Sequence, residues 1–394
     1  MQLTNDQYQG LSKLERWYQK YDHQFIEISG VVGTGAWDLV QQFIDNQGFD
    51  GREVMYISYD QKQVLELAAK RYHAYYINGI IYNYTRIVDL DSLPVVNPHS
   101  DGIVRYEWKK DIRKKVDPKY KLIVVFDSVL MSHQTLMDLA TFELPVILLR
   151  DPMLTPAPDT YTFMKDPNIT LREVHPLYAG NPIMYFAHKI LLGEKIQPGS
   201  YDNVSVVPRK NMNLYNLRSS DMNITVSEAL RQQTNKVYRE NILKRKDSVN
   251  IVGERLIVMS NMYDHKIVNP DEKKIKVYLT RGTVGYITKI NRHVHGTKYV
   301  PIEFRAEFYH EPFGDLVLER HKLNGIEAPS RQIVPDEIIE MEYAYALSVP
   351  MARVGHWDKV TLIVDQNELN DPDLQRKLLY TAISKARKSL TIVI

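Results

Sequence analysis

A glycine-rich segment at residues 30–38, Gly-Val-Val-Gly-Thr-Gly-Ala-Trp-Asp, carries the clearest chemical signal in the chain. It follows the pattern G-x-x-x-x-G-K-[ST], in which backbone N–H groups cradle phosphates, the lysine reaches the β- and γ-phosphate oxygens and the hydroxyl holds Mg²⁺. The glycines that this loop requires are Gly30, Gly33 and Gly35. Ala36 stands where the lysine belongs, and Trp37 where the hydroxyl belongs. The segment predicts a phosphate-binding loop without its cation or its metal ligand.

The residues on both sides of this loop fit the elements that would position it. Residues 24–28 are apolar enough for a buried strand, and residues 38–44 have apolar side chains at helical spacing. Asp38 would open this helix, and its carboxylate would repel the anion that a helix N-terminus attracts. A tight strand-to-helix connection that binds no phosphate is the alternative.

A second apolar run, residues 121–126, ends in Asp127. A carboxylate at the end of such a strand is the group that holds Mg²⁺ beside the phosphate loop of NTPases. A solvated aspartate at a strand end is the alternative interpretation. The order and spacing of the two segments along the chain favour a nucleotide site.

Composition sets the broad limits. The 394 residues are 44% hydrophobic and 25% charged, which is ordinary for a soluble protein of two or three domains. No apolar run is long enough to span a bilayer, and no leader peptide is evident, so we expect a cytoplasmic protein. There is no cysteine and no H-E-x-x-H pattern, so no metal site is expected. The net charge is only +2, so a nucleic-acid surface would have to be local.

Strand-like and helix-like segments alternate along the first 150 residues, which predicts a parallel α/β sheet. The expected strands are 54–58, 122–126 and 146–149, and the expected helices are 61–70 and 134–139. Residues 84–121 contain three prolines and look like an insertion. Residues 270–335 contain short strands separated by turn residues, which indicates a small β-barrel. The last sixty residues return to alternating strand and helix.

Further motifs resemble those of superfamily 1B DNA helicases, in the RecD-like and phage Dda-type branch, over nearly the full length. Residues 3–7 are similar to the adenine-reading motif that ends in Gln7, and residues 341–358 follow the track Ala-Leu-Thr-Val-His-Lys-x-Gln-Gly. Residues 379–387, Leu-Tyr-Thr-Ala-Ile-Ser-Lys-Ala-Arg, nearly match Tyr-Thr-Ala-Ile-Thr-Arg-Ala-Arg. The resemblance places Lys385 at the position of the arginine finger.

The resemblance implies an α/β fold of two RecA-like parallel-sheet domains, with an SH3-like β-barrel and a small accessory insertion. The first RecA-like domain would comprise 1–83 and 122–175, with the accessory insertion at 84–121. The second would comprise 176–269 and 336–394, with the barrel at 270–335.

The departures from the family pattern predict a pseudo-helicase whose ATPase is lost. The degenerate positions are Ala36, Trp37, Asp127, Ser128, Leu154, Pro176 and Lys385. Asp127 has Ser128 after it in place of a glutamate, Leu154 replaces a glutamine sensor, and Pro176 replaces a phosphate-contacting arginine. Because phosphoryl transfer depends almost entirely on positioning and charge stabilisation, loss of several of these groups together argues against hydrolysis. No cofactor is expected; if ATP binding is retained, its residues would be Gln7, Gly30, Gly33, Thr34 and Gly35.

A pseudo-helicase of this family that has lost its ATPase could still bind single-stranded DNA. The candidate contacts are Lys109, Lys110, Arg113, Lys114, Lys115, Tyr76 and Trp357. A solvated amphipathic helix over the basic stretch 109–121, and tyrosines that merely pack, are the alternatives. We therefore expect a scaffold that binds nucleic acid or a protein partner of a replication, recombination or transcription complex, encoded by a phage or another mobile element. An active ATP-dependent 5′→3′ helicase and an inhibitor of a host helicase or nuclease remain alternative hypotheses.

Overall fold

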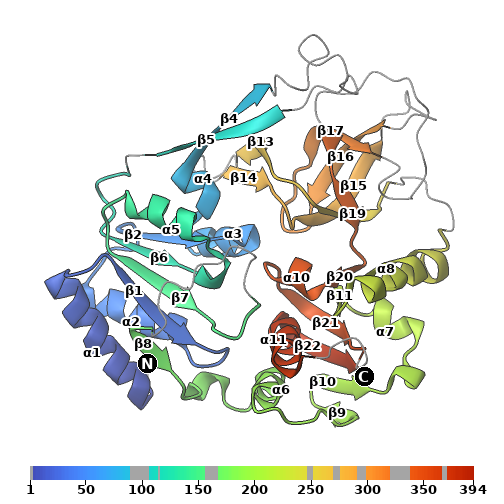
Figure 1. The fold of residues 1–394 in the computed structure, drawn as a ribbon, viewed down its shortest axis with the longest axis horizontal. Helices are drawn as coiled ribbons and strands as arrows, with labels where there is room; N and C mark the ends of the chain where they lie inside the picture. The colour runs from blue at the N-terminus through green and yellow to red at the C-terminus, as the bar shows by residue number, and fades with distance from the viewer. Residues whose placement is uncertain are drawn as a thin grey trace. The chain divides into compact units, whose positions relative to one another are not determined.

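The computed structural model describes residues 3–88, 106–113, 116–155, 167–245, 252–268, 276–290, 299–319, 338–365 and 371–394. The chain forms two compact units. Unit 1 comprises residues 1–81, 112–231 and 348–394, and unit 2 comprises 82–111 and 232–347. Figure 1 shows the helices and strands of both units.

Unit 1 contains a six-stranded sheet in the order β3-β2-β6-β7-β1-β8. Its strands are β1 (Phe25–Gly30), β2 (Val54–Ser58), β3 (His73–Tyr76), β6 (Leu122–Val125), β7 (Val146–Arg150) and β8 (Ile169–Leu171). Every pairing is parallel; Ile26, for example, lies opposite Ile147, and Ile28 opposite Leu149. The strands read as continuous apolar runs because both faces of a parallel sheet are covered by helices. The parallel α/β sheet predicted from the sequence is confirmed.

Five helices accompany these strands along the described part of the chain. They are α1 (Asn5–Lys20), α2 (Ala36–Gln47), α3 (Gln61–Ala69), α4 (Ile77–Ile81) and α5 (His133–Ala140). Helix α2 buries Leu39, Val40, Phe43 and Ile44 on one face, and it ends at Gly48, whose φ of 65° is the left-handed C-cap that favours glycine. The apolar face of α2 belongs to the same core as β1 and β6, which holds the start of the helix at the edge of the sheet.

A second six-stranded sheet has the order β20-β11-β21-β22-β10-β9. Its strands are β9 (Gly199–Tyr201), β10 (Val204–Val207), β11 (Met222–Thr225), β20 (Ala346–Ser348), β21 (Trp357–Ile363) and β22 (Ala386–Val393). The pairs β11–β21, β21–β22 and β10–β22 are parallel, and β9 is antiparallel to β10. The associated helices are α6 (Pro182–Leu191), α7 (Leu214–Arg218), α8 (Glu228–Val237), α10 (Val349–Ala352) and α11 (Pro372–Ile383). Parallel α/β sheets on both sides of the cleft described below agree with the RecA-like architecture that the sequence implies.

Unit 2 is built on a third sheet, in the order β18-β17-β16-β15-β12-β19. Its strands are β12 (Arg255–Val258), β15 (Val284–Ile290), β16 (Tyr299–Ala306), β17 (Phe313–Glu319), β18 (Ile338–Ile339) and β19 (Met341–Tyr343). The two edge strands, β18 and β19, are separated in sequence by Glu340 alone, so the sheet must curl until its edges adjoin. The curled sheet takes strands from both sides of the 270–335 range, and an SH3-like barrel stays a prediction.

Two β-ribbons complete unit 2. One pairs β13 (Met262–Val268) with β14 (Lys276–Leu279), and the other pairs β4 (Tyr82–Val88) with β5 (Tyr106–Ile112). The β4–β5 ribbon lies within the expected accessory insertion, but β4 starts at Tyr82, and residues 112 and beyond belong to unit 1. The four-domain division proposed from the sequence stays a prediction.

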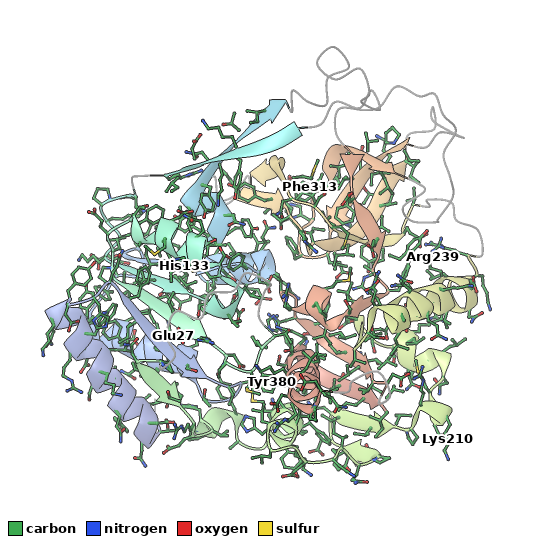
Figure 2. The ribbon with its side chains drawn as sticks, viewed as in Figure 1. Glu27, His133, Lys210, Arg239, Phe313 and Tyr380 are labelled. Carbon is green, nitrogen blue, oxygen red and sulfur yellow. The ribbon has the colours of Figure 1, made fainter. Side chains whose placement is uncertain are left out.

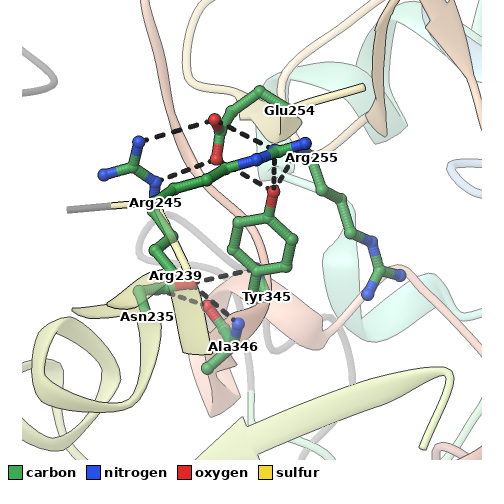
Figure 3. Close-up of polar contacts among 7 residues, drawn as sticks. All are labelled: Asn235, Arg239, Arg245, Glu254, Arg255, Tyr345 and Ala346. Atoms are coloured by element: carbon green, nitrogen blue, oxygen red, sulfur yellow. Dashed lines mark hydrogen bonds and ion pairs between the residues drawn. The ribbon is translucent and has the colours of Figure 1, made fainter. Parts of the chain in front are cut away.

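A buried polar network joins the end of α8 to the curled sheet (Figure 3). The π-helical turn Tyr238–Ile242 extends α8, and its Arg239 pairs with Glu254, which is completely buried just before β12. Tyr345 also donates a hydrogen bond to Glu254. The hydroxyl, the guanidinium and the carboxylate satisfy one another, as buried polar groups must.

Candidate functional site

The glycine loop, residues 30–35, joins β1 to α2 at the carboxyl end of the strand. Gly35 precedes the helix with a φ of 69°, in the left-handed region that favours glycine. At Gly30 a Cβ atom would lie 2.4 Å from Oγ1 of Thr34, so a side chain there would displace the loop. The loop therefore leads directly into the N-terminus of a twelve-residue helix. The backbone N–H groups at such an N-terminus can hold an anion.

Gln7 is fully buried, and its amide holds this loop. Nε2 donates hydrogen bonds to the carbonyl oxygens of Thr34, at 3.1 Å, and Gly35, at 3.0 Å. Oε1 accepts a hydrogen bond from the backbone N–H of Thr4 at 2.9 Å. An amide nitrogen carries two hydrogens, so neither is left to donate to an adenine ring. Gln7 fixes the loop in this structure, and its role in reading a nucleotide stays a prediction.

A cleft of about 310 Å³ lies beside the glycine loop, within unit 1. Its wall comes from the carboxyl ends of β1, β6 and β7 and from the residues that follow α11. The polar side chains that line it include Thr34, Asp38, Asp127, Asp151, His356 and Lys385. The structure thus brings together segments that the sequence singled out separately: the glycine loop, the aspartate after β6 and Lys385.

Trp37 occupies the position where the loop pattern calls for a metal-binding hydroxyl. Its ring packs against Phe126, with centroids 5.0 Å apart, and edge-on against Tyr56 at 5.7 Å. These are normal distances for aromatic packing, so the ring is held in the core that supports the cleft. At this position the helix presents an apolar ring in place of a Mg²⁺ ligand.

Asp38 adds a negative charge to the first turn of the same helix. The side chain is buried, and its Oδ2 accepts a hydrogen bond from the Tyr178 hydroxyl at 3.1 Å. Ala36, which precedes it, supplies no cation. The residues present therefore do not fit a magnesium–triphosphate group: the loop has neither the lysine nor the hydroxyl, and it has a carboxylate that opposes the ligand's charge.

Two aspartates face the cleft from the first sheet. Asp127 follows β6 with a φ of 48° and begins the short 3-10 helix Ser128–Leu130. Asp151 follows β7; it accepts a hydrogen bond from the Tyr380 hydroxyl, and its Oδ1 accepts one from the Met153 N–H at 2.9 Å. Burial raises the pKa of Asp151 to about 6, against the opposing effect of the Tyr380 hydrogen bond. The carboxyl at this edge is therefore harder to ionise than an ordinary aspartate.

Lys385 follows α11 and is only 2% exposed, although it carries an ammonium group. Within the described ranges, its Nζ makes no hydrogen bond and no ion pair within 4 Å. Burial lowers the pKa of Lys385, while the charges of Asp127, Asp60 and Asp151 act in the opposite direction. The charges of these three carboxylates thus offset only part of the cost of burying the ammonium group.

His356 precedes β21 and lines the same cleft. Its Nδ1 lies 3.6 Å from Oδ2 of Asp60, the residue that caps α3. Burial, and next the charge of Lys385, lower the pKa of His356. The sequence analysis did not single out His356, because a lone histidine before a strand carries no pattern of its own.

The other degenerate positions lie around this cleft in different ways. Leu154 is buried and lines it, and Ser128 is buried beside Asp127. Pro176 is exposed at the start of the short 3-10 helix Pro176–Tyr178, whose Tyr178 reaches the cleft. None of these side chains supplies the functional group of the corresponding family residue, which is a glutamine amide for Leu154, a glutamate carboxylate for Ser128 and an arginine guanidinium for Pro176. Among the described residues, no group of three or more histidine, aspartate or glutamate side chains is placed to hold a metal ion.

The described residues that are expected to bind nucleic acid are divided between the two units. Lys109 and Lys110 are exposed on β5, so a helix over this stretch, the alternative raised above, is wrong for the residues that the structure describes. Arg113 is half-buried just after the strand, and Lys114 and Lys115 lie outside the described residues. A DNA-binding role for these cations stays a prediction.

The two aromatic candidates for stacking are buried in this structure. Tyr76 is 7% exposed and Trp357 is 9% exposed. A base needs an open ring face for stacking. Neither ring offers one in this arrangement, so their contribution to binding stays a prediction.

Tyr380 is the main functional candidate that the sequence analysis missed. It is completely buried on α11 (Figure 2), and its hydroxyl accepts a hydrogen bond from the backbone N–H of Val32, in the glycine loop, at 2.7 Å. Tyr380 belongs to the segment 379–387, which drew attention for Lys385. The sequence motif therefore contained Tyr380, but only the tertiary structure places its hydroxyl against the glycine loop.

No protein-family model matches the chain, and no curated protein matches it. Solved structures of helicases do resemble it at low identity. The Pif1 helicase from Bacteroides in complex with ADP-AlF3 and ssDNA has a TM-score of 0.45 at 13% identity, covering 100% of this chain and 92% of that one. Pif1 helicase from Candida albicans has a TM-score of 0.43 at 11% identity, covering 100% and 94%.

A structure of two coordinating Pif1 helicases that unwind forked dsDNA has a TM-score of 0.47 at 11% identity, covering 100% of this chain and 92% of that one. TM-scores below 0.5 at such identities do not by themselves establish a shared function. The proposed function therefore rests on the residues and the cleft of this chain.

Within the described residues, no helix is long and apolar enough to cross a membrane.

Proposed function

We propose that this protein is a helicase-like scaffold, which binds nucleic acid or a protein partner of a replication, recombination or transcription complex without ATP-driven unwinding. The sequence motifs supply the helicase resemblance, and the parallel sheets with a glycine loop agree with it. The chemistry of the cleft argues against a motor.

The observation that carries this proposal is the start of helix α2. There Ala36 offers no charge, Trp37 packs its ring on Phe126, and Asp38 places a buried carboxylate in the first turn. A terminal phosphate would meet a carboxylate and an aromatic ring where hydrolysis requires a cation and Mg²⁺. Electrostatic stabilisation of the transition state is usually the largest contribution to enzymatic rate enhancement. A negative group where the reaction requires a positive one therefore removes the main contribution to the rate of hydrolysis.

Phosphate release by the purified protein tests the loss of hydrolysis. We expect turnover of Mg·ATP, with or without single-stranded DNA, to equal that of an Asp127→Asn variant, because neither protein has the cation that the reaction requires. An Ala36→Lys/Trp37→Thr variant should stay inactive as well, because Ser128, Leu154 and Pro176 leave the other parts of the machinery missing. DNA-stimulated turnover that Asp127→Asn abolishes would overturn the proposal.

Fluorescence anisotropy with a labelled single-stranded oligonucleotide tests nucleic-acid binding. We expect a Lys109→Gln/Lys110→Gln variant to bind more weakly, with the slope of log K against log salt reduced by roughly 1.4, the value for two phosphate contacts on a single strand. A Lys195→Gln/Lys210→Gln variant removes two exposed lysines from unit 1 and should leave the slope unchanged. An equal effect of both pairs would show that the β4–β5 ribbon has no specific role. If the wild-type protein binds no oligonucleotide, the protein-partner branch of the proposal alone remains.

A further inference from the structure

We infer that Tyr380 is a latch, which fixes the glycine loop through hydrogen bonds of its own hydroxyl. The hydroxyl of Tyr380 accepts the hydrogen bond from the Val32 N–H at 2.7 Å and donates its own hydrogen to the Asp151 carboxylate. The hydroxyl therefore acts both as an acceptor and as a donor, and its hydrogen points toward the carboxylate of Asp151. Tyr380 itself is completely buried, which shields its hydroxyl from water.

The carbonyl group of Val32 is held as well. Its carbonyl oxygen lies 2.8 Å from Nε2 of His188, which is on α6. The following residue, Gly33, accepts a hydrogen bond from the His175 N–H at 2.8 Å. Helices α6 and α11 pack on each other, so the two side chains that hold Val32 come from one helical layer. Val32 is thus hydrogen-bonded at both its N–H and its C=O.

The residue next to the latch holds the neighbouring loop. Oγ1 of Thr381 accepts a hydrogen bond from the N–H of Thr155 at 3.0 Å, and both residues are buried. Val32 and Thr155 belong to the segments that follow β1 and β7, which are adjacent parallel strands. Two consecutive residues of α11 therefore bind the ends of two neighbouring strands.

Two backbone N–H groups of the loop remain without an acceptor in the described part of the chain. Among the residues that the structure describes, no acceptor pairs with the backbone N–H of Gly33 or Gly35. Val32 differs from these two positions because a protein side chain already occupies its N–H. The loop is consequently ordered by the protein itself, and an incoming anion would have to displace Tyr380 to use the Val32 amide.

Amide hydrogen exchange tests this inference directly. In the wild-type protein, the Val32 N–H should exchange more slowly than those of Gly33 and Gly35, measured by NMR at single-residue resolution. In a Tyr380→Phe variant, exchange at Val32 should become about five to ten times faster, as expected for loss of one net hydrogen bond. Exchange at Thr155 should change little, because the Thr381 hydroxyl remains.

Two further variants separate the latch from a general loss of stability. Thr381→Val should give the reverse pattern, with faster exchange at Thr155 and little change at Val32. Tyr345→Phe is the matched control, because Tyr345 is also a buried tyrosine that donates to a carboxylate, but it lies in unit 2. It should leave both amides unchanged.

A Val32 amide that exchanges as fast as those of Gly33 and Gly35 in the wild-type protein would overturn the inference, and this measurement does not require any variant to fold. An equal acceleration at Val32 by Tyr380→Phe and Tyr345→Phe would overturn it as well. The outcome is independent of the ATPase assay. DNA-stimulated turnover would refute the proposed function, whereas the exchange pattern tests the latch alone.

Discussion

The buried carboxylate of Glu254 offers the sharpest test of how unit 2 is held together. Its side chain has no exposed surface, and it pairs with Arg239 at 2.9 Å and with Arg245 at 3.2 Å (Figure 3). The Tyr345 hydroxyl also donates a hydrogen bond to it at 2.9 Å. Burial, and next the charge of Glu254, raise the pKa of this hydroxyl, which keeps it a hydrogen-bond donor at neutral pH.

Replacing Glu254 by alanine removes the acceptor of all these hydrogen bonds and leaves the two guanidinium groups of Arg239 and Arg245 without their carboxylate. Arg239 is only 9% exposed, so it has little access to water as a substitute. Breaking a buried ion pair by removing one partner costs about 3–5 kcal/mol of unfolding free energy. Arg245 is 22% exposed and can turn partly toward solvent, which favours the lower end of that range.

Urea denaturation monitored by circular dichroism measures this loss. Glu303→Ala is the matched control, because Glu303 pairs with the exposed Lys289 on the surface of the same sheet, and its removal should change the free energy little. An Arg239→Leu/Glu254→Leu variant should recover much of the loss, since replacing a whole buried pair by apolar residues is often neutral.

A Glu254→Ala variant that loses less than about 1 kcal/mol would refute this reasoning, since that is the range of an exposed pair. It would mean that the carboxylate of Glu254 is reached by water in solution. A double replacement as damaging as the single one would instead show that packing, and not the uncompensated charge, causes the loss.

Two further predictions concern the cleft. Because burial raises the pKa of Asp151 from 3.8 to about 6, the folded state holds this proton more tightly than the unfolded chain does. The resulting stability is fully present below about pH 4 and is lost as the pH rises to about 6, by about 3 kcal/mol at most. Urea midpoints across this pH range should show that fall for the wild-type protein and a smaller one for Asp151→Asn; parallel curves would contradict the prediction. Lys385→Met should raise the melting temperature, because it removes a buried ammonium that makes no hydrogen bond and keeps the apolar stem. A lower melting temperature would show that the attraction of Asp127, Asp60 and Asp151 outweighs the cost of burying the charge.

The sequence predicted the elements of the first sheet closely. Residues 54–58 were expected as a strand and form β2, and the expected helix 61–70 is α3, which ends one residue earlier at Ala69. These assignments succeeded because a strand buried on both faces is a continuous apolar run, and a helix repeats its apolar residues every three or four positions. The strand-to-helix glycine loop was also recognisable from the sequence, because its glycines satisfy a local backbone requirement.

The basic stretch and the small barrel show where local patterns were insufficient. Lys109 and Lys110 are equally compatible with an exposed helix and an exposed strand, because charged side chains carry no apolar period; the structure places them on β5. The curled sheet of unit 2 takes β12, β18 and β19 from outside 270–335. Short strands do not reveal which distant strand they pair with, because pairing depends on contacts that no local window contains.

By itself, the sequence determined which groups are missing from the cleft: a side chain that is absent, such as a lysine at Ala36 or a hydroxyl at Trp37, cannot be supplied by folding. The tertiary structure alone decided what the remaining groups contact. Val32 and Tyr380 are 348 residues apart in the chain, yet one hydrogen bond joins them. The distance of Lys385 from its carboxylates and the burial of Glu254 between two arginines likewise depend on how distant segments pack. Such contacts follow from the three-dimensional arrangement of the sheets and helices, which no spacing along the chain encodes.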